Sequence, residues 1–301
     1  MRTAFAVFTL PLFAANGAEP ANQATTHLPV AALIANLPHP ATTPLSGSEF
    51  VRLVSDMNPR QREREILNAI VAGNVPGFLK DLVPVTLRYR PGTGKEVEAT
   101  IFAMPEYVAI GSDRDFIRIP MNLYTASAVA SRLGLTLPTR KIVDAIYRSA
   151  SHFSPEPMTP GPQMRSTEYY RIHNERIDSQ GRMLGIMPGS LVAGHKKDVV
   201  LTPLLDRNPG RIAIYGWHRL TGVPIQPLST VHGACYADYS HGIRLISETV
   251  LVNGNARSIY DLLKDPVLAN LVSDEGPFPN ARETMKRLAT GNDCDSVQPI
   301  G

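Results

Sequence analysis

The sequence predicts an α+β protein with a mixed, mostly antiparallel central sheet and flanking helices. Two observations lead to this class. Short runs rich in β-branched and aromatic residues are bounded by glycine, proline and asparagine, and a few capped amphipathic helices are interspersed among them. No segment repeats at a fixed period, so the pattern does not indicate a solenoid or a propeller. With 301 residues, 43% hydrophobic and 19% charged, the chain can bury a substantial core.

Residues 1–18 have the features of a secretory signal peptide. A basic start is followed by an apolar run over residues 3–15 and by small residues at positions 16–18. We therefore expect a secreted or periplasmic protein; the alternative is a buried N-terminal helix. Residues 19–47, rich in alanine, proline and threonine, are expected to form a flexible spacer. No later run approaches the ~20 apolar residues of a membrane span, so we expect no transmembrane anchor.

Residues 48–301 are expected to form a single globular α+β domain. Asn58-Pro59 is typical of a helix start, and Gly73 ends that helix. Strands are predicted over residues 83–89, 96–104 and 107–110, with the pattern continuing through 113–119. Residues 122–133 and 138–150 are predicted to form two helices, the second capped by Thr139. The proline-rich residues 153–163 mark either a boundary between two lobes or a simple connection.

The second half is predicted to consist of strands and turns followed by short helices. Residues 190–201 indicate a strand, a tight polar turn and a second strand, and residues 211–217 indicate another strand. Residues 242–252 indicate a strand that ends in the hairpin turn Asn253-Gly254. A helix interrupted near Pro266 and a last short helix complete the chain.

Residues 213–245 are the expected active-site segment. They hold the only tryptophan of the chain, one of its two cysteines and three of its eight histidines. Histidine transfers protons near neutral pH and is the commonest metal ligand, so we take the histidines of the mature domain as catalytic candidates. The candidate catalytic residues are His195, His218, His232, His241 and Asp238.

Asp238 is expected to orient one of these histidines. If residues 238–242 formed a strand, Asp238 and His241 would lie on opposite faces, because side chains alternate along a strand. The expected partner of Asp238 is therefore His218 or His232. The alternative is a half-buried polar strand whose histidines are simply hydrogen-bonded.

The candidate substrate-binding residues are aromatic or basic. Trp217, Tyr236 and Tyr239 can stack on a sugar ring or fill a core, and Arg244 can bind a carboxylate as a planar fork. The cofactor is left open, with a zinc ion held by His232, Asp238 and another histidine as the candidate.

Two further features have alternatives that the sequence leaves open. Outside the cytoplasm, Cys235 and Cys294 either form one disulfide or remain free thiols. The neighbouring carboxylates Asp274 and Glu275 are either functional groups or part of a solvated turn.

Several well-known motifs are absent. The sequence has no His-Glu-x-x-His, no Gly-x-Ser-x-Gly, no Ser-x-x-Lys, no phosphate-binding Gly-x-x-x-x-Gly-Lys and no Cys-x-x-Cys. This argues against the common zinc proteases, α/β-hydrolases, serine acyl transferases and nucleotide hydrolases. A net charge of +3 without a long basic run argues against a nucleic-acid partner.

One short stretch resembles a known family. Residues 240–245, Ser-His-Gly-Ile-Arg-Leu, with His232-Gly233 upstream, resemble the Ser-His-Gly-Cys-x-Arg signature of the L,D-transpeptidases, which crosslink peptidoglycan through a cysteine. Ile243 stands where that family has its nucleophile, and Cys235 lies several residues too early. The resemblance implies an affinity for cell-wall peptides. Residues 194–198, 215–218 and 238–242 together are similar to exported bacterial proteins of uncharacterised chemistry, which implies a bacterial origin and no mechanism.

These observations favour a secreted hydrolase that acts on a cell-envelope or extracellular polymer through a histidine-rich cleft. One alternative is a non-catalytic protein that binds a glycan or peptide in the same groove. Another is an acyl transferase that uses Cys235. In each case the expected partner is a polymer or peptide outside the cytoplasm.

Overall fold

The computed structural model describes residues 43–291 and residue 294. The expected signal peptide and most of the expected spacer lie outside these residues. The first helix, α1 (Gly47–Val54), begins at the last residue of the expected spacer. Ser46 caps this helix through a reciprocal pair of hydrogen bonds with Glu49, which fixes where the folded chain starts.

Helices and short strands alternate along the described chain. The helices after α1 are α2 (Pro59–Val71), the 3-10 helix η2 (Gly77–Lys80), α3 (Leu123–Leu133), α4 (Arg140–Ser149), the 3-10 helix η3 (Pro162–Arg165), α5 (Thr167–Leu184), α6 (Leu204–Arg207), α7 (Ile259–Lys264), α8 (Ala269–Val272) and α9 (Ala281–Thr290). The strands are β1 (Val83–Tyr89), β2 (Val97–Ala103), β3 (Ala109–Gly111), β4 (Phe116–Arg118), β5 (Leu135–Thr136), β6 (Ser151–His152), β7 (Val192–Ala193), β8 (Lys197–Val199), β9 (Ile214–His218), β10 (Pro224–Ser229), β11 (His241–Gly242), β12 (Ile246–Ser247), β13 (Thr249–Val252) and β14 (Asn255–Ser258).

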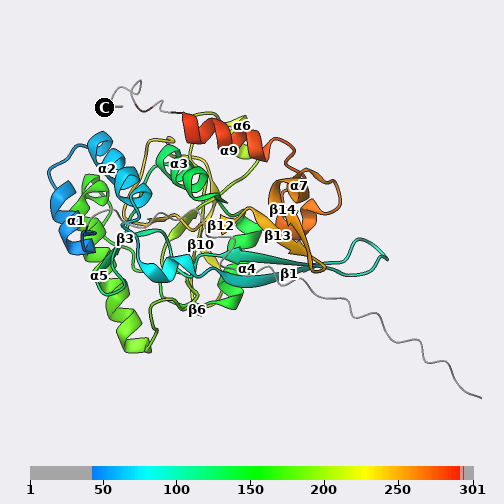
Figure 1. The fold of residues 1–301 in the computed structure, drawn as a ribbon, viewed down its shortest axis with the longest axis horizontal. Coiled ribbons are helices and arrows are strands. Elements are labelled where there is room, and N and C mark those ends of the chain that lie inside the picture. The colour runs from blue at the N-terminus through cyan, green and yellow to red at the C-terminus, as the bar shows by residue number, and fades with distance from the viewer. Residues whose placement is uncertain (1–42, 292–293, 295–301) are drawn as a thin grey trace, which may run out of the picture.

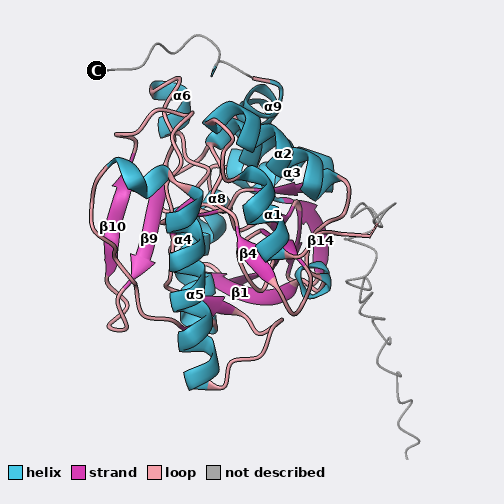
Figure 2. Ribbon diagram, turned by 90° about the vertical axis from the view of Figure 1, so that its left-hand side faces the viewer, coloured by secondary structure: helices cyan, strands magenta, loops and turns pink. Residues whose placement is uncertain are grey.

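The larger sheet is antiparallel and has the order β14-β13-β2-β12-β5, with β1 paired along the whole of β2. A second sheet has the order β10-β9-β8-β11, and within it β11 runs parallel to β8. Figure 2 shows β9 and β10 on one side of the molecule and β1 and β14 on the other. Helix α4 lies between them and contacts both β1 and β9. The predicted α+β class with mostly antiparallel strands is confirmed.

A continuous hydrophobic core joins the first described helix to the last. Its buried residues run from Phe50 in α1 to Leu288 in α9, and both sheets contribute to it. Helices α1, α2 and α5 cover one end of the molecule, and α9 packs along α3 at another (Figure 1). The core therefore continues across the proline-rich segment 153–163. Phe153 and Met158 of that segment are buried, and the amide of Met158 donates to the Tyr239 hydroxyl at 2.7 Å.

Local capping signals account for the elements that the sequence located correctly. Asn58, Asn122 and Thr139 each accept a hydrogen bond from a backbone amide in the first turn of α2, α3 and α4, respectively. Asn253-Gly254 connects β13 to β14 with positive φ at both residues, as a tight hairpin turn requires.

The strand, tight turn and strand predicted over residues 190–201 are present as β7, a bend at residues 194–196 and β8, although β7 pairs with β6 and β8 pairs with β9 and β11. Two other parts of the prediction are wrong. The expected strand over residues 242–252 is broken into β11, β12 and β13. Residues 167–184, for which no helix was expected, form the longest helix in the described chain, α5, capped by Ser166.

Cys235 and Cys294 form a disulfide. It ties the end of the described chain to the loop that precedes β11. Within residues 43–291, no helix combines the length and the apolar character that crossing a bilayer requires.

Candidate functional site

The structure divides the predicted site residues among three polar clusters. The first, which we call the histidine cluster, consists of Lys197, Trp217, His232, Tyr236, Asp238 and His241. The second is centred on Glu106 and includes His195. The third is centred on Asp144 and includes His218.

His241 is the innermost residue of the histidine cluster. It lies on β11, in register with Lys197 of the parallel neighbour β8, so both side chains project from the same face of the sheet. Its ring is fully buried, and neither ring nitrogen has a hydrogen-bond partner among the described residues. Buried polar groups in folded proteins are almost always paired, so an imidazole with two unbonded nitrogens is an exception that calls for an explanation.

Asp238 lies beside His241 and is held in place by three hydrogen bonds. Its Oδ1 accepts from the amide of Ser240 at 2.8 Å and from the Ser240 hydroxyl at 2.5 Å, and its Oδ2 accepts from the Tyr236 hydroxyl at 3.0 Å. Burial acts to raise the pKa of Asp238, but His241 and the bonds from Ser240 outweigh it, so this pKa lies below its usual value. Burial also lowers the pKa of His241, against the attraction of Asp238. The pair is therefore a carboxylate beside a neutral imidazole.

The expectation that Asp238 and His241 lie on opposite faces is wrong. It assumed a strand from residue 238 onward, whereas Tyr239 and Ser240 form a turn and only His241 and Gly242 belong to β11. The amide of His241 donates to the carbonyl of Asp238 at 3.0 Å, which closes that turn. The turn brings the carboxylate round to the imidazole, so Asp238 acts on His241. It also acts on His232, one of the two expected partners, whereas His218 is bound to Asp144.

The outer part of the histidine cluster is aromatic and cationic. The rings of His232 and Tyr236 are half-buried and stack with their centroids 4.3 Å apart. Arg165 lies over the Tyr236 ring at 5.3 Å, and Lys197 lies over the Trp217 ring at 5.2 Å. The His232 and Tyr236 centroids are 6.3 and 5.7 Å from that of His241, so this half-buried stack lies next to the buried imidazole.

Trp217 has an unusual backbone. Its φ is +54°, in the left-handed region that bulky residues rarely adopt, and its amide donates to the carbonyl of Lys196 at 3.0 Å. Strain of this kind often occurs at functional sites, where surrounding contacts maintain it. Tyr239 fills the core, which was one of its two expected roles, and its buried hydroxyl bonds to Met158.

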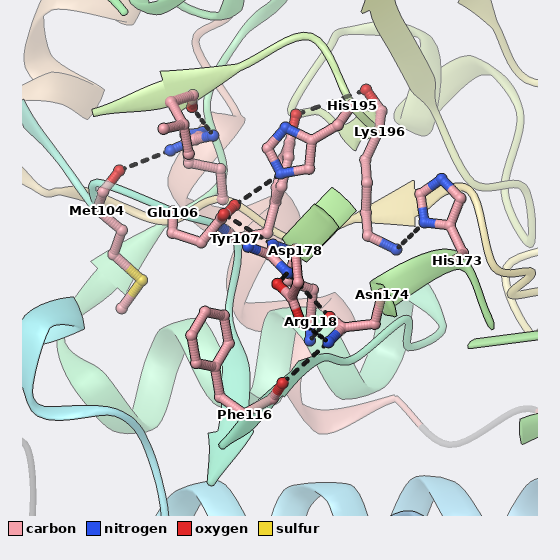
Figure 3. Close-up of polar contacts among 12 residues, drawn as sticks. Met104, Glu106, Tyr107, Phe116, Arg118, His173, Asn174, Asp178, His195 and Lys196 are labelled. Carbon is pink, nitrogen blue, oxygen red and sulfur yellow. Dashed lines mark hydrogen bonds and ion pairs between the residues drawn. The ribbon is translucent and has the colours of Figure 1, made fainter. Parts of the chain in front are cut away.

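The Glu106 cluster is a buried ion network (Figure 3). Oε2 of Glu106 accepts from Nε of Arg118 at 2.7 Å, and Oε1 lies 2.9 Å from Nε2 of His195. Nη1 of Arg118 donates to Asn174 at 3.0 Å and to Asp178 at 2.7 Å, both on α5. Burial acts to raise the pKa of Glu106, but Arg118 and His195 hold it far below its usual value, and burial lowers the pKa of His195 to about 4. Glu106 is thus a fixed anion rather than a proton donor.

Arg244 does not face a substrate. It is fully buried and lies over the Tyr107 ring at 4.4 Å. Nη1 donates to the carbonyl of Met104 at 2.8 Å and Nη2 to that of Val192 at 2.6 Å. The guanidinium therefore joins the end of β2 to β7 instead of binding a carboxylate.

The Asp144 cluster lies on α4 and β9. Oδ1 of Asp144 accepts from the Tyr215 hydroxyl at 2.9 Å and is 3.0 Å from Nε2 of His218. The Tyr147 ring stacks against both His218 and His152, with centroid distances of 4.4 and 4.0 Å. His218 is thus bound to a different carboxylate from the expected Asp238.

Comparisons with protein-family models, with curated proteins and with solved structures found no match to this chain.

The arrangement of the described side chains supports neither a zinc site nor a reactive cysteine. Among the described residues, no group of three or more His, Cys, Asp or Glu side chains is arranged to hold a metal ion. The hydroxyl and amide donors on Asp238 occupy the oxygens that a zinc ion would take. Cys235 is bonded to Cys294, so it presents no thiol in this structure.

The carboxylates Asp274 and Glu275 pair outside the histidine cluster. Asp274 accepts from Nε of Arg140 at 2.8 Å, and Glu275 accepts from the Thr202 hydroxyl at 2.8 Å. They tie the loop after α8 to the start of α4 and to the segment that follows β8.

Sequence reasoning missed Glu106, Arg118 and Lys196. Glu106 is the one acidic residue in the otherwise apolar stretch 99–110, and a lone acid in such a run is a usable signal of a buried ion pair. Lys196 was read as part of a polar turn, yet it is 1% exposed. Its Nζ donates to the carbonyl of Tyr239 at 2.7 Å. The same atom lies 3.5 Å from Nδ1 of His173 (Figure 3).

Lys196 is expected to make stability depend on pH in alkaline solution. Burial lowers its pKa from 10.5 to about 7 in the folded protein. Between these values the unfolded chain binds the proton and the folded protein does not, so stability rises with pH. In urea denaturation from pH 7 to 10, we expect the wild type to gain free energy of unfolding relative to Lys196→Met. Equal slopes for the two proteins would contradict the assignment.

Proposed function

We propose that the protein is a secreted hydrolase that acts on a cell-envelope or extracellular polymer, with the histidine cluster as its active site. One observation carries this proposal: His241 is fully buried, has no hydrogen-bond partner on either nitrogen among the described residues, and lies beside an ionised Asp238. A neutral imidazole next to a fixed carboxylate is suited to take a proton from water and to be stabilised once charged.

The roles of the other residues follow from their positions. His241 accepts a proton from water, and the resulting hydroxide attacks the substrate. Asp238 stabilises the imidazolium, which then gives its proton to the leaving group. Lys197, in register with His241, can stabilise negative charge on the substrate. His232 and Tyr236, which are half-buried, provide ring faces for a sugar or a peptide side chain, whereas Trp217 is buried behind the cluster's surface.

Loss of the imidazole is expected to abolish turnover. We expect His241→Ala to lower kcat/KM by about 10²- to 10⁴-fold on whichever polymer the wild type cleaves, the usual contribution of a general base. Peptidoglycan and a panel of polysaccharides serve as substrates, with released reducing ends and amines as the readout. His152→Ala is the matched control, because His152 lies outside the histidine cluster and bonds to the carbonyl of Tyr147.

The pH profile separates catalysis from a structural role. Because only the neutral imidazole acts as a base and burial lowers the pKa of His241, the acid limb of kcat/KM should lie below the ordinary histidine pKa of about 6.5. Wild-type cleavage that survives in His241→Ala with an unchanged acid limb would overturn the assignment.

A second candidate is non-catalytic binding of a glycan or peptide at the same cluster. It is favoured by the half-exposed stack of His232 on Tyr236 with Arg165 above it. If no substrate in the panel is cleaved while Tyr236→Ala weakens retention on one of the polymers, binding replaces hydrolysis as the function. For the acyl-transferase alternative, activity that persists in Cys235→Ser would exclude a role for the thiol.

A further inference from the structure

A pocket of about 340 Å³ opens away from the histidine cluster, none of whose six residues lines it. Its walls come from α1, β4, α5 and the loop that joins α5 to β7. This volume lies at the small end of the roughly 300–1,000 Å³ typical of ligand pockets, so it suits one or two amino-acid residues or a group of that size.

The floor of the pocket presents a donor and an acceptor side by side. Arg118 and Asp178 both line it, and they are bonded to each other through Nη1 and Oδ1 at 2.7 Å. Nε of Arg118 is used by Glu106, whereas Nη2 makes no hydrogen bond with any described residue. The Asp178 side chain is 32% exposed, so its carboxylate can still accept from a ligand.

The walls are apolar and partly aromatic. Phe78 and Phe116 meet edge to face with centroids 5.2 Å apart, and Phe153, Ile177 and Val192 are buried behind them. At the rim, Met187 is 70% exposed. The walls can therefore cover an apolar side chain of a bound ligand while the ligand's backbone reaches Arg118 and Asp178.

The charges of the lining nearly cancel. Five carboxylates and four guanidinium groups line the pocket, and most of them are paired within the protein. A strongly charged ligand, such as a phosphate or a polyamine, gains no net attraction there. A neutral ligand with one N–H and one C=O matches the floor better.

We propose that this pocket binds a peptide residue with an apolar side chain, whose carbonyl accepts from Arg118 and whose N–H donates to Asp178. The side chain packs against Phe78, Phe116 and Phe153. The proposal does not rest on hydrolysis at the histidine cluster, and it adds a second contact point for a peptide-bearing polymer.

The probe for this pocket is N-acetylphenylalanine N-methylamide, a neutral residue with a complete peptide group on each side. Its binding to the full chain is measured by saturation-transfer NMR, together with benzylamine and phenylacetate, which share the ring and carry opposite charges. We expect the blocked residue to bind at least ten-fold more tightly than either. Equal binding of the three probes would show that the ring alone is recognised and would overturn the proposal.

Two variants test whether the blocked residue binds in this pocket. Gly181→Leu fills the pocket, because a Cβ at Gly181 would point at the Phe153 ring at 3.5 Å without a clash. Asp178→Ala removes the acceptor. Each is expected to weaken binding of the blocked residue at least ten-fold, whereas Ser179→Ala, on the same helix outside the pocket, should not. If one variant fails to fold, as judged by its circular dichroism, the other decides; unchanged binding in a folded variant would refute the site.

Discussion

Replacing Arg118 by methionine is expected to lower the free energy of unfolding by about 3–5 kcal/mol, the usual cost of leaving a buried ion without its partner. The side chains of Arg118 and Glu106 are only 5% and 4% exposed, so solvent replaces little of the lost bond. Asn174 and Asp178 lose their shared donor as well. The measurement is urea denaturation at pH 7, with the exposed Arg182→Met on the neighbouring helix as control.

The double variant Arg118→Met/Glu106→Gln tests whether the unpaired carboxylate of Glu106 causes the loss of stability. Glutamine carries no charge, so the penalty for the uncompensated carboxylate disappears and part of the lost stability should return. A loss below about 1 kcal/mol in Arg118→Met, the range of an exposed ion pair, would show that water reaches Glu106.

Removing the disulfide has the second-largest expected effect. Cys235 and Cys294 are 59 residues apart, so their bond restricts the unfolded chain strongly. We expect Cys235→Ser/Cys294→Ser to lower the free energy of unfolding by about 2–4 kcal/mol. A reducing agent should have a similar effect on the wild type and none on the double variant. Equal stability of oxidised and reduced wild type would contradict this.

The elements that the sequence located correctly are those with local signals. Asn58-Pro59, Thr139 and Asn253-Gly254 act through hydrogen bonds and backbone angles within a few residues, so their effect can be read without the rest of the fold. The α+β class follows from many such signals together.

The errors in predicted secondary structure arose where hydrogen bonds of side chains, rather than the hydrophobic pattern, determine the local conformation. Residues 195–198 are polar enough to suggest a solvated turn, but Glu106, Tyr239 and Tyr107 bind their side chains inside the core, and only residues 194–196 form the bend that precedes β8. In the same way, the bonds of Ser240 to Asp238 favour a turn where alternation suggested a strand. The partners of residues 195–198 lie at least 43 residues away in the sequence, so no local pattern reveals them, whereas Asp238 and Ser240 are two residues apart and form a local turn that the alternation pattern overlooked.

The candidate site was predicted in part. The segment 213–245 does contain His232, Asp238 and His241 of the histidine cluster. Lys197 joins it and Arg165 contacts it from distant parts of the chain, whereas His195 and His218 are held elsewhere by Glu106 and Asp144. Composition indicated which residue types mattered, but only the sheet register shows which of them meet.

The position of Trp217 has a practical consequence. It is the only tryptophan in the sequence, and Lys197 lies over its ring at 5.2 Å in the histidine cluster. Intrinsic fluorescence excited near the indole absorption band therefore reports on that cluster alone, without any label. A ligand that docks there should change the emission, whereas one held between Arg118 and the phenylalanines should leave it unchanged. The chain thus carries its own spectroscopic means of telling its two proposed binding places apart.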